Sequence, residues 1–158
     1  MKRLIAAMIA AAGLAAAPAQ AQSTSGQFDV TITLTAACTL SAVADVAFAY
    51  TSLQGGVANA TGGGFSVTCT NNLPYAFGLQ AGTGAAVPPG AATINVTDDA
   101  VNLAYQLALS AAGGSGSGAA QNFSVTGTMA ASQGGTCAAA SCTNAAATNN
   151  RHTLIVSY

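Results

Sequence analysis

Charged side chains are almost missing from this sequence of 158 residues, which contains three Lys and Arg residues and four Asp and Glu residues. Two of the cations, Lys2 and Arg3, stand at the very start, so the chain from residue 22 onward has Arg151 as its one cation. With four Asp residues, that part has a formal net charge of −3 (one minus four). A nucleic-acid-binding protein needs a basic surface, so this function is excluded. The lack of Lys beyond position 2 also excludes Schiff-base chemistry.

Long apolar runs are missing as well, since crossing a bilayer takes about 20 apolar residues. The run from Leu4 to Ala17 is shorter, follows the positive start, and precedes the small residues Ala19 and Ala21. This layout is typical of a secretory signal peptide with a small-x-small cleavage site. We therefore expect residues 1–21 to be removed and the mature chain to begin near Gln22. The protein should be exported through the periplasm to the cell surface or the extracellular space.

Residues able to perform chemistry are equally scarce. His152 is the one histidine, and no Gly-x-Ser-x-Gly motif accompanies it to suggest a nucleophile. Asp98 and Asp99 are adjacent, but too few oxygen ligands lie nearby for a calcium site, so they indicate a turn. The run Gly62–Gly64 lacks the Lys and the Ser or Thr of a phosphate-binding loop. We expect no enzymatic activity, no cofactor and no bound metal ion.

The sequence has four cysteines, and all of them lie beyond the predicted signal peptide. They are Cys38, Cys69, Cys137 and Cys142. An even number of cysteines in an exported chain predicts disulfide bonds. Four cysteines allow three pairings, and the short Ala-Ala-Ala-Ser gap between the last two favours Cys137–Cys142 together with Cys38–Cys69.

What the sequence does have is alternation of apolar and polar residues with a period of two, which is typical of β-strands. The clearest example is the run Phe28, Val30, Ile32 and Leu34. Further strands are predicted at 43–50, 65–70, 75–79, 94–96, 101–109, 123–129 and 152–158. Turns separate them, with loops at 82–90, 113–118 and 130–150. Many short strands and scarce helices predict an all-β sandwich in one domain.

Several motifs along the chain resemble those of one known family. They are Val-Thr-Cys-Thr at 67–70, Leu-Pro-Tyr at 73–75, Leu-Gln-Ala-Gly at 79–82, Leu-x-Tyr-x-Leu at 103–107 and Leu-Ile-Val-x-Tyr at 154–158. The pattern resembles that of spore coat protein U domain proteins, which include the subunits of Csu-type archaic chaperone–usher pili. The resemblance covers the whole predicted mature chain. The loop between Cys137 and Cys142 is an addition to that pattern.

The resemblance implies an immunoglobulin-like β-sandwich that lacks its last strand and is completed by a donor strand from a neighbouring subunit. The chain would then consist of a signal peptide at 1–21, a donor segment at 22–36 and the sandwich at 37–158. The candidate donor residues are Phe28, Val30, Ile32 and Leu34. Their alternation also fits an ordinary first strand of the same molecule.

The last predicted strand has a second implied role. Its alternate residues Leu154, Val156 and Tyr158 could be the place where a periplasmic chaperone binds. An ordinary closing strand fits the same residues.

The implied function is that of a structural subunit of an archaic chaperone–usher pilus, which polymerises by donor-strand exchange and supports surface attachment and biofilm formation. Its partners would be identical or related pilin subunits, a periplasmic chaperone and an outer-membrane usher. Two alternatives are an adhesin-type binding protein and a secreted coat protein with a closed β-sandwich.

Overall fold

The computed structural model describes residues 22–82 and 90–158. The predicted signal peptide and most of the predicted loop at 82–90 therefore lie outside the described residues. The chain divides into two compact units, Met1–Thr33 and Leu34–Tyr158. In the first unit, the described residues 22–33 form no strand or helix and are exposed. The structure has no helix in its described parts that could span a membrane.

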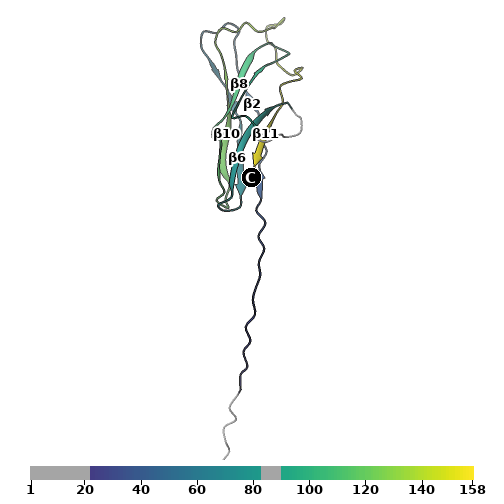
Figure 1. Cartoon of the computed structure of the whole chain (residues 1–158). Coiled ribbons are helices and arrows are strands. Elements are labelled where there is room, and N and C mark those ends of the chain that lie inside the picture. Colours follow the sequence, from purple (N-terminus) through teal and green to yellow (C-terminus); the bar gives the residue numbers. More distant parts are fainter. Residues whose placement is uncertain (1–21, 83–89) are drawn as a thin grey trace, which may run out of the picture. The chain divides into compact units, whose positions relative to one another are not determined.

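The second unit is built from β-strands alone among its described residues (Figure 1). The strands are β1 (Cys38–Leu40), β2 (Val46–Ala47), β3 (Ala58–Asn59), β4 (Thr61–Gly62), β5 (Gly64–Cys69), β6 (Pro74–Ala81), β7 (Thr93–Thr97), β8 (Ala104–Leu109), β9 (Gly113–Ser115), β10 (Gln121–Met129) and β11 (His152–Ser157). The larger sheet has the order β1-β5-β10-β8-β7, with β3 paired to β10. A second sheet has the order β11-β6-β9, and β2 pairs with β4.

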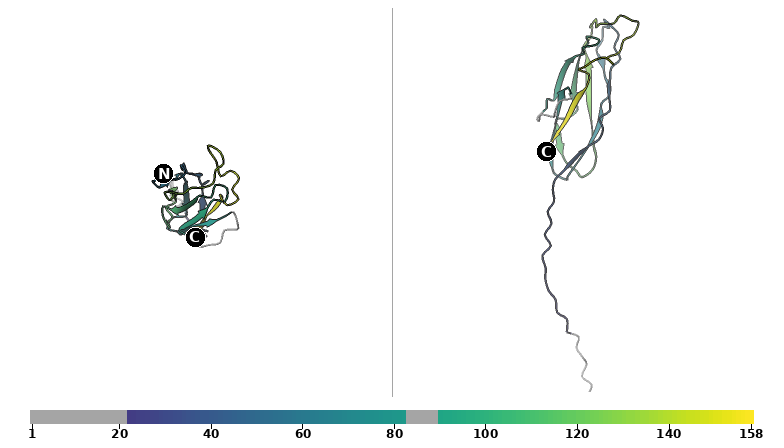
Figure 2. Two further views of the ribbon diagram at one scale, coloured as in Figure 1. Left: turned by 90° about the horizontal axis from the view of Figure 1, so that it is seen from above. Right: turned by 90° about the vertical axis from the view of Figure 1, so that its right-hand side faces the viewer.

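The two sheets enclose an apolar core, which makes the unit an all-β sandwich (Figure 2). Strand β5 and the second half of β10 alternate buried and more exposed residues, because successive side chains of a strand point to opposite faces. Strand β6 alternates only up to Phe77 and is buried from Phe77 to Leu79. Aromatic rings fill the centre, where the Phe77 and Phe123 rings lie 4.7 Å apart at a steep angle. Each fully buried large apolar side chain contributes about 1.5–3 kcal/mol. The predicted fold class is confirmed.

Both disulfide bonds favoured by the spacing are present. The Cys38–Cys69 bond joins β1 to β5 in the larger sheet, and its Cys69 is 1% exposed. In a chain-entropy estimate, closing this loop contributes about 3–4 kcal/mol to stability. The Cys137–Cys142 bond closes a small ring within the loop at 130–150. No free cysteine occurs among the described residues.

Several strand boundaries differ from the sequence-based expectation. The Gly/Ser stretch expected to be a loop contains β9, which pairs with β6 through backbone groups and therefore needs no apolar alternation. A Cβ on Gly113 would lie 2.2 Å from the carbonyl oxygen of Tyr75, so glycine permits this close approach. The short strands β1, β3 and β4 were also not predicted. The run at 28–35 forms no strand in the structure.

Candidate functional site

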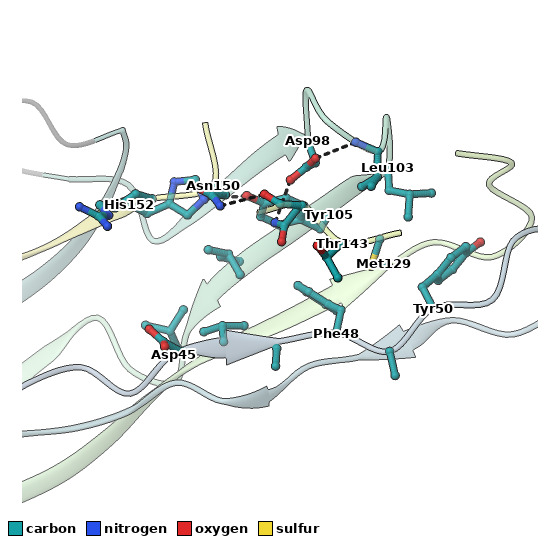
Figure 3. Close-up of a pocket in the computed structure, with 18 of the residues that line it drawn as sticks. Asp45, Phe48, Tyr50, Asp98, Leu103, Tyr105, Met129, Thr143, Asn150 and His152 are labelled. Atoms are coloured by element: carbon teal, nitrogen blue, oxygen red, sulfur yellow. Dashed lines mark hydrogen bonds between the residues drawn. The ribbon is translucent and has the colours of Figure 1, made fainter. Parts of the chain in front are cut away.

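A groove of about 1000 Å³ opens along the sandwich between two segments of the chain (Figure 3). One wall consists of residues 43–51, including β2. The other wall consists of residues 150–154, where β11 begins, and of loop residues 141–144. Figure 3 shows Phe48 extending from the first wall toward the space between the walls.

The floor of the groove is apolar. Leu79, Leu107, Val125 and Met129 lie under it and are at most 5% exposed. Over them stand half-buried side chains from the walls and the adjacent strands: Val46, Phe48, Leu103, Tyr105 and Leu154. A closed sandwich would cover such side chains with another strand, because apolar area left in water forgoes about 25 cal/mol per Å². The groove is therefore a place where the core is only partly covered.

Backbone geometry shows that β11 has an unpaired edge, and the start of this strand, up to Leu154, lines the groove. In β6, the N–H and C=O of Leu79 bond Ala91, and the N–H of Phe77 bonds Ala112, on the side away from β11. Their partners across the ladder, Leu154 and Val156, therefore form non-hydrogen-bonded pairs with β6.

It follows that the N–H and C=O groups of Leu154 and Val156 point away from β6. Within residues 22–82 and 90–158, no strand pairs with that side of β11. Unpaired backbone groups beside a groove with an apolar floor are the features that accept an additional strand.

Glycine at position 127 allows the first wall to lie close to the floor. A Cβ on Gly127 would be 2.5 Å from Cζ of Phe48 and 2.9 Å from Cβ of Ala60. The Phe48 ring lies over β10 here and packs against Tyr105, with ring centroids 5.7 Å apart. Any side chain at this position would push the Phe48 ring toward the groove.

Polar residues close the end of the groove that lies beyond the start of β11. Asp98 is 2% exposed, and its Oδ1 accepts the N–H groups of Ala100 and Val101 at 2.9 and 3.0 Å. Its Oδ2 accepts the side-chain amide of Asn144 at 2.9 Å. The predicted turn at Asp98 is therefore present, and it anchors the loop that forms part of the groove wall.

The single histidine lies beside this end. Its Nε2 is 2.8 Å from the hydroxyl of Tyr105. Burial lowers the pKa of His152, and burial followed by the charge of Asp98 raises the pKa of Tyr105. Both side chains are therefore neutral at pH 7. The hydrogen-bond partner of the imidazole is a phenol and not a carboxylate, so the residues do not form a Ser–His–Asp arrangement.

Asp99 also acts as a structural acceptor. The hydroxyl and the N–H of Thr148 bond its carboxylate, and the hydroxyl is the main cause of a lowered pKa of Asp99. No cluster of three or more His, Cys, Asp or Glu residues occurs in the described part of the chain. The carboxylates of Asp98 and Asp99 accept hydrogen bonds from protein N–H and O–H groups, as expected of turn residues.

The candidate donor residues are strongly exposed. Phe28, Val30, Ile32 and Leu34 are 86%, 72%, 84% and 79% exposed. Large apolar side chains seldom cluster at such exposure in a soluble monomer, and such clusters mark interaction sites.

The candidate chaperone-binding residues lie on or beside the open edge described above. Leu154 and Val156 are half-buried on β11, and Tyr158 follows the end of that strand. Among the described residues no strand pairs with this edge, and the structure thus places two of these three residues on it.

Sequence reasoning missed the residues that hold the groove walls together. Gln133 donates its N–H to the hydroxyl of Tyr50, and its side chain bonds both the N–H and the C=O of Ala104. Asn144 holds the opposite wall through Asp98. Both residues lie in a polar, alanine-rich loop, where no spacing or motif distinguishes them from their neighbours.

Comparison with known protein families shows to which family this chain belongs. The sequence model of the Spore Coat Protein U domain matches residues 24–153. This domain is found in chaperone–usher pilus subunits, which are structural and surface-exposed proteins assembled with a chaperone and an usher, and it is not known to be enzymatic. No curated protein and no solved structure matches the chain. The chain belongs to the Spore Coat Protein U domain family.

Proposed function

We propose that this protein is a structural subunit of an archaic chaperone–usher pilus, and that its subunits join by donor-strand exchange to support surface attachment and biofilm formation. The observation that carries the proposal is the groove with an apolar floor beside the unpaired edge of β11 in the described part of the chain. The same chain supplies an exposed alternating segment of suitable length. A groove on one copy and a strand on the next make a head-to-tail contact, which produces a filament when it does not close into a ring.

The direction of backbone groups supports a specific placement of the donor. On β11, the residues with free N–H and C=O groups are also those whose side chains face the core, namely Leu154 and Val156. Residues directly opposite each other in an antiparallel ladder have side chains on the same face of the sheet. We place the donor strand antiparallel to β11 with Val30 opposite Val156 and Ile32 opposite Leu154, so that both donor side chains face the core and Thr31 is directed to the outer face.

The free energy gained by burying the donor segment in this contact is large compared with that gained by burying one side chain. Four fully buried side chains contribute roughly 6–12 kcal/mol before the cost of ordering the segment. Their exposure in the described chain means that nearly all of this area is available for burial. Before assembly, a periplasmic chaperone would occupy the same β11 edge, with Leu154, Val156 and Tyr158 in the contact.

Capture of a synthetic donor peptide tests the proposal. The acceptor is the full exported chain carrying Val30→Asp and Ile32→Asp, which disable its own donor segment. A peptide of residues 22–36 should bind it with one-to-one stoichiometry, measured by isothermal titration calorimetry. The same peptide with Ile32→Asp should not bind, because burying an unpaired charge is costly, whereas the peptide with Thr31→Asp should bind. Equal behaviour of the two substituted peptides would contradict the proposal.

A further inference from the structure

Part of the groove is walled by a loop and not by β11. Loop residues Ser141, Cys142, Thr143 and Asn144 line the space beyond the start of that strand. The Cys137–Cys142 bond closes a ring in this loop.

The loop is attached to the turn at 98–103 on both sides of that ring. On one side, the N–H of Thr136 donates to the carbonyl of Val101 at 2.7 Å. On the other side, Asn144 donates to the buried carboxylate of Asp98 at 2.9 Å. Two anchors joined through a short disulfide ring leave this part of the wall little freedom to move.

We propose that the Cys137–Cys142 ring positions the loop at 141–144 as the wall of a distal subsite, which receives Leu34 of a neighbouring copy. The assignment of Leu34 rests on the proposed function and follows from the antiparallel placement. Since β11 begins at His152, the C-terminal end of an antiparallel donor lies at the start of β11 or beyond it. Among the four donor side chains, Leu34 is therefore the one nearest the loop.

The opposite end of the donor provides an internal control. In the same placement, Phe28 lies near the end of β11, far along the strand from the disulfide ring. Loss of the ring should therefore affect the contribution of Leu34 and leave that of Phe28 unchanged. A general loss of stability would instead weaken both contributions alike.

A double-mutant cycle tests this inference with the peptide assay described above. The two acceptors are the donor-disabled full chain and the same chain with Cys137→Ser and Cys142→Ser. Both are titrated with the peptide of residues 22–36 and with its Leu34→Ala and Phe28→Ala forms. Mass spectrometry under non-reducing conditions verifies that the bond between Cys38 and Cys69 remains.

The expected result is a change in one arm of the cycle. Leu34→Ala should weaken binding to the intact acceptor by about tenfold and to the ring-less acceptor by less than about threefold. Phe28→Ala should weaken binding to both acceptors by the same factor. If Leu34→Ala has equal effects on the two acceptors, the inference is overturned while the proposed function stands. If no peptide binds either acceptor, the proposed function itself fails.

A second acceptor variant covers the case in which the serine variant does not fold. Asn144→Ala in the donor-disabled chain removes one anchor of the loop and leaves both disulfide bonds in place. It should reduce the effect of Leu34→Ala in the same direction. An unchanged effect of Leu34→Ala in this variant would overturn the inference.

Discussion

Removing the side chain of Ile32 should weaken the fibre without affecting the fold of the subunit that carries the change. Ile32 is 84% exposed and lies in none of the strands, so its truncation removes little from its own subunit. In the fibre, the same side chain would be buried in the groove of the next subunit. Ile32→Ala should then cost about 2 kcal/mol per contact, which corresponds to about a 30-fold weaker contact.

The assay is the release of monomers from purified fibres in increasing denaturant, followed by gel electrophoresis without heating. Thr31→Ala is the matched control, because Thr31 would face outward and should change the contact by less than about twofold. Near-ultraviolet circular dichroism of each chain, measured with bound donor peptide, reports on the sandwich itself. The reasoning is refuted if Ile32→Ala and Thr31→Ala fibres dissociate alike, or if Ile32→Ala disrupts the sandwich of its own subunit.

Two other changes test the groove and its histidine. Gly127→Ala should lower donor-peptide affinity measured by calorimetry, because its Cβ pushes the Phe48 ring toward the groove, whereas Gly64→Ala meets no atom within 4 Å and should not. The pKa of His152 lies below 6.5 because the side chain is buried; protonation therefore favours the unfolded chain. Thermal stability of the peptide-bound chain should be constant above about pH 7 and decrease from there toward about pH 5. The His152→Gln variant should show a smaller decrease. An equally steep decrease in this variant would contradict the assignment of the pH dependence to His152.

The sandwich was largely predictable because its strands bury alternate side chains. Phe65, Val67 and Cys69 alternate with polar residues, and the structure buries all three. The wall at 43–50 gave a weaker pattern, and only Val46–Ala47 forms a strand there. The alternation of residues 43–50 still predicts that the side chain of Phe48 faces the core. It does not predict which of these residues pair with another strand.

What could not be predicted depends on backbone pairing and on polar contacts. Strand β9 pairs through Gly113 and Gly114, which have no side chains to form a pattern. The open edge of β11 is likewise invisible in the sequence, since an edge strand and a central strand can have the same alternation. The contact between Asn144 and Asp98 joins residues 46 positions apart, and neither lies in a recognisable motif.

Amide hydrogen exchange along β11 tests most directly whether the groove accepts a strand. In the donor-disabled chain, the amides of Thr153 and Ile155 face β6 and should exchange slowly, while those of Leu154 and Val156 should exchange quickly. Addition of the peptide of residues 22–36 should slow exchange at Leu154 and Val156 by at least about tenfold, because new ladder hydrogen bonds form there. If these two amides are already slow without the peptide, or remain fast with it, β11 is not the open edge that accepts a donor strand.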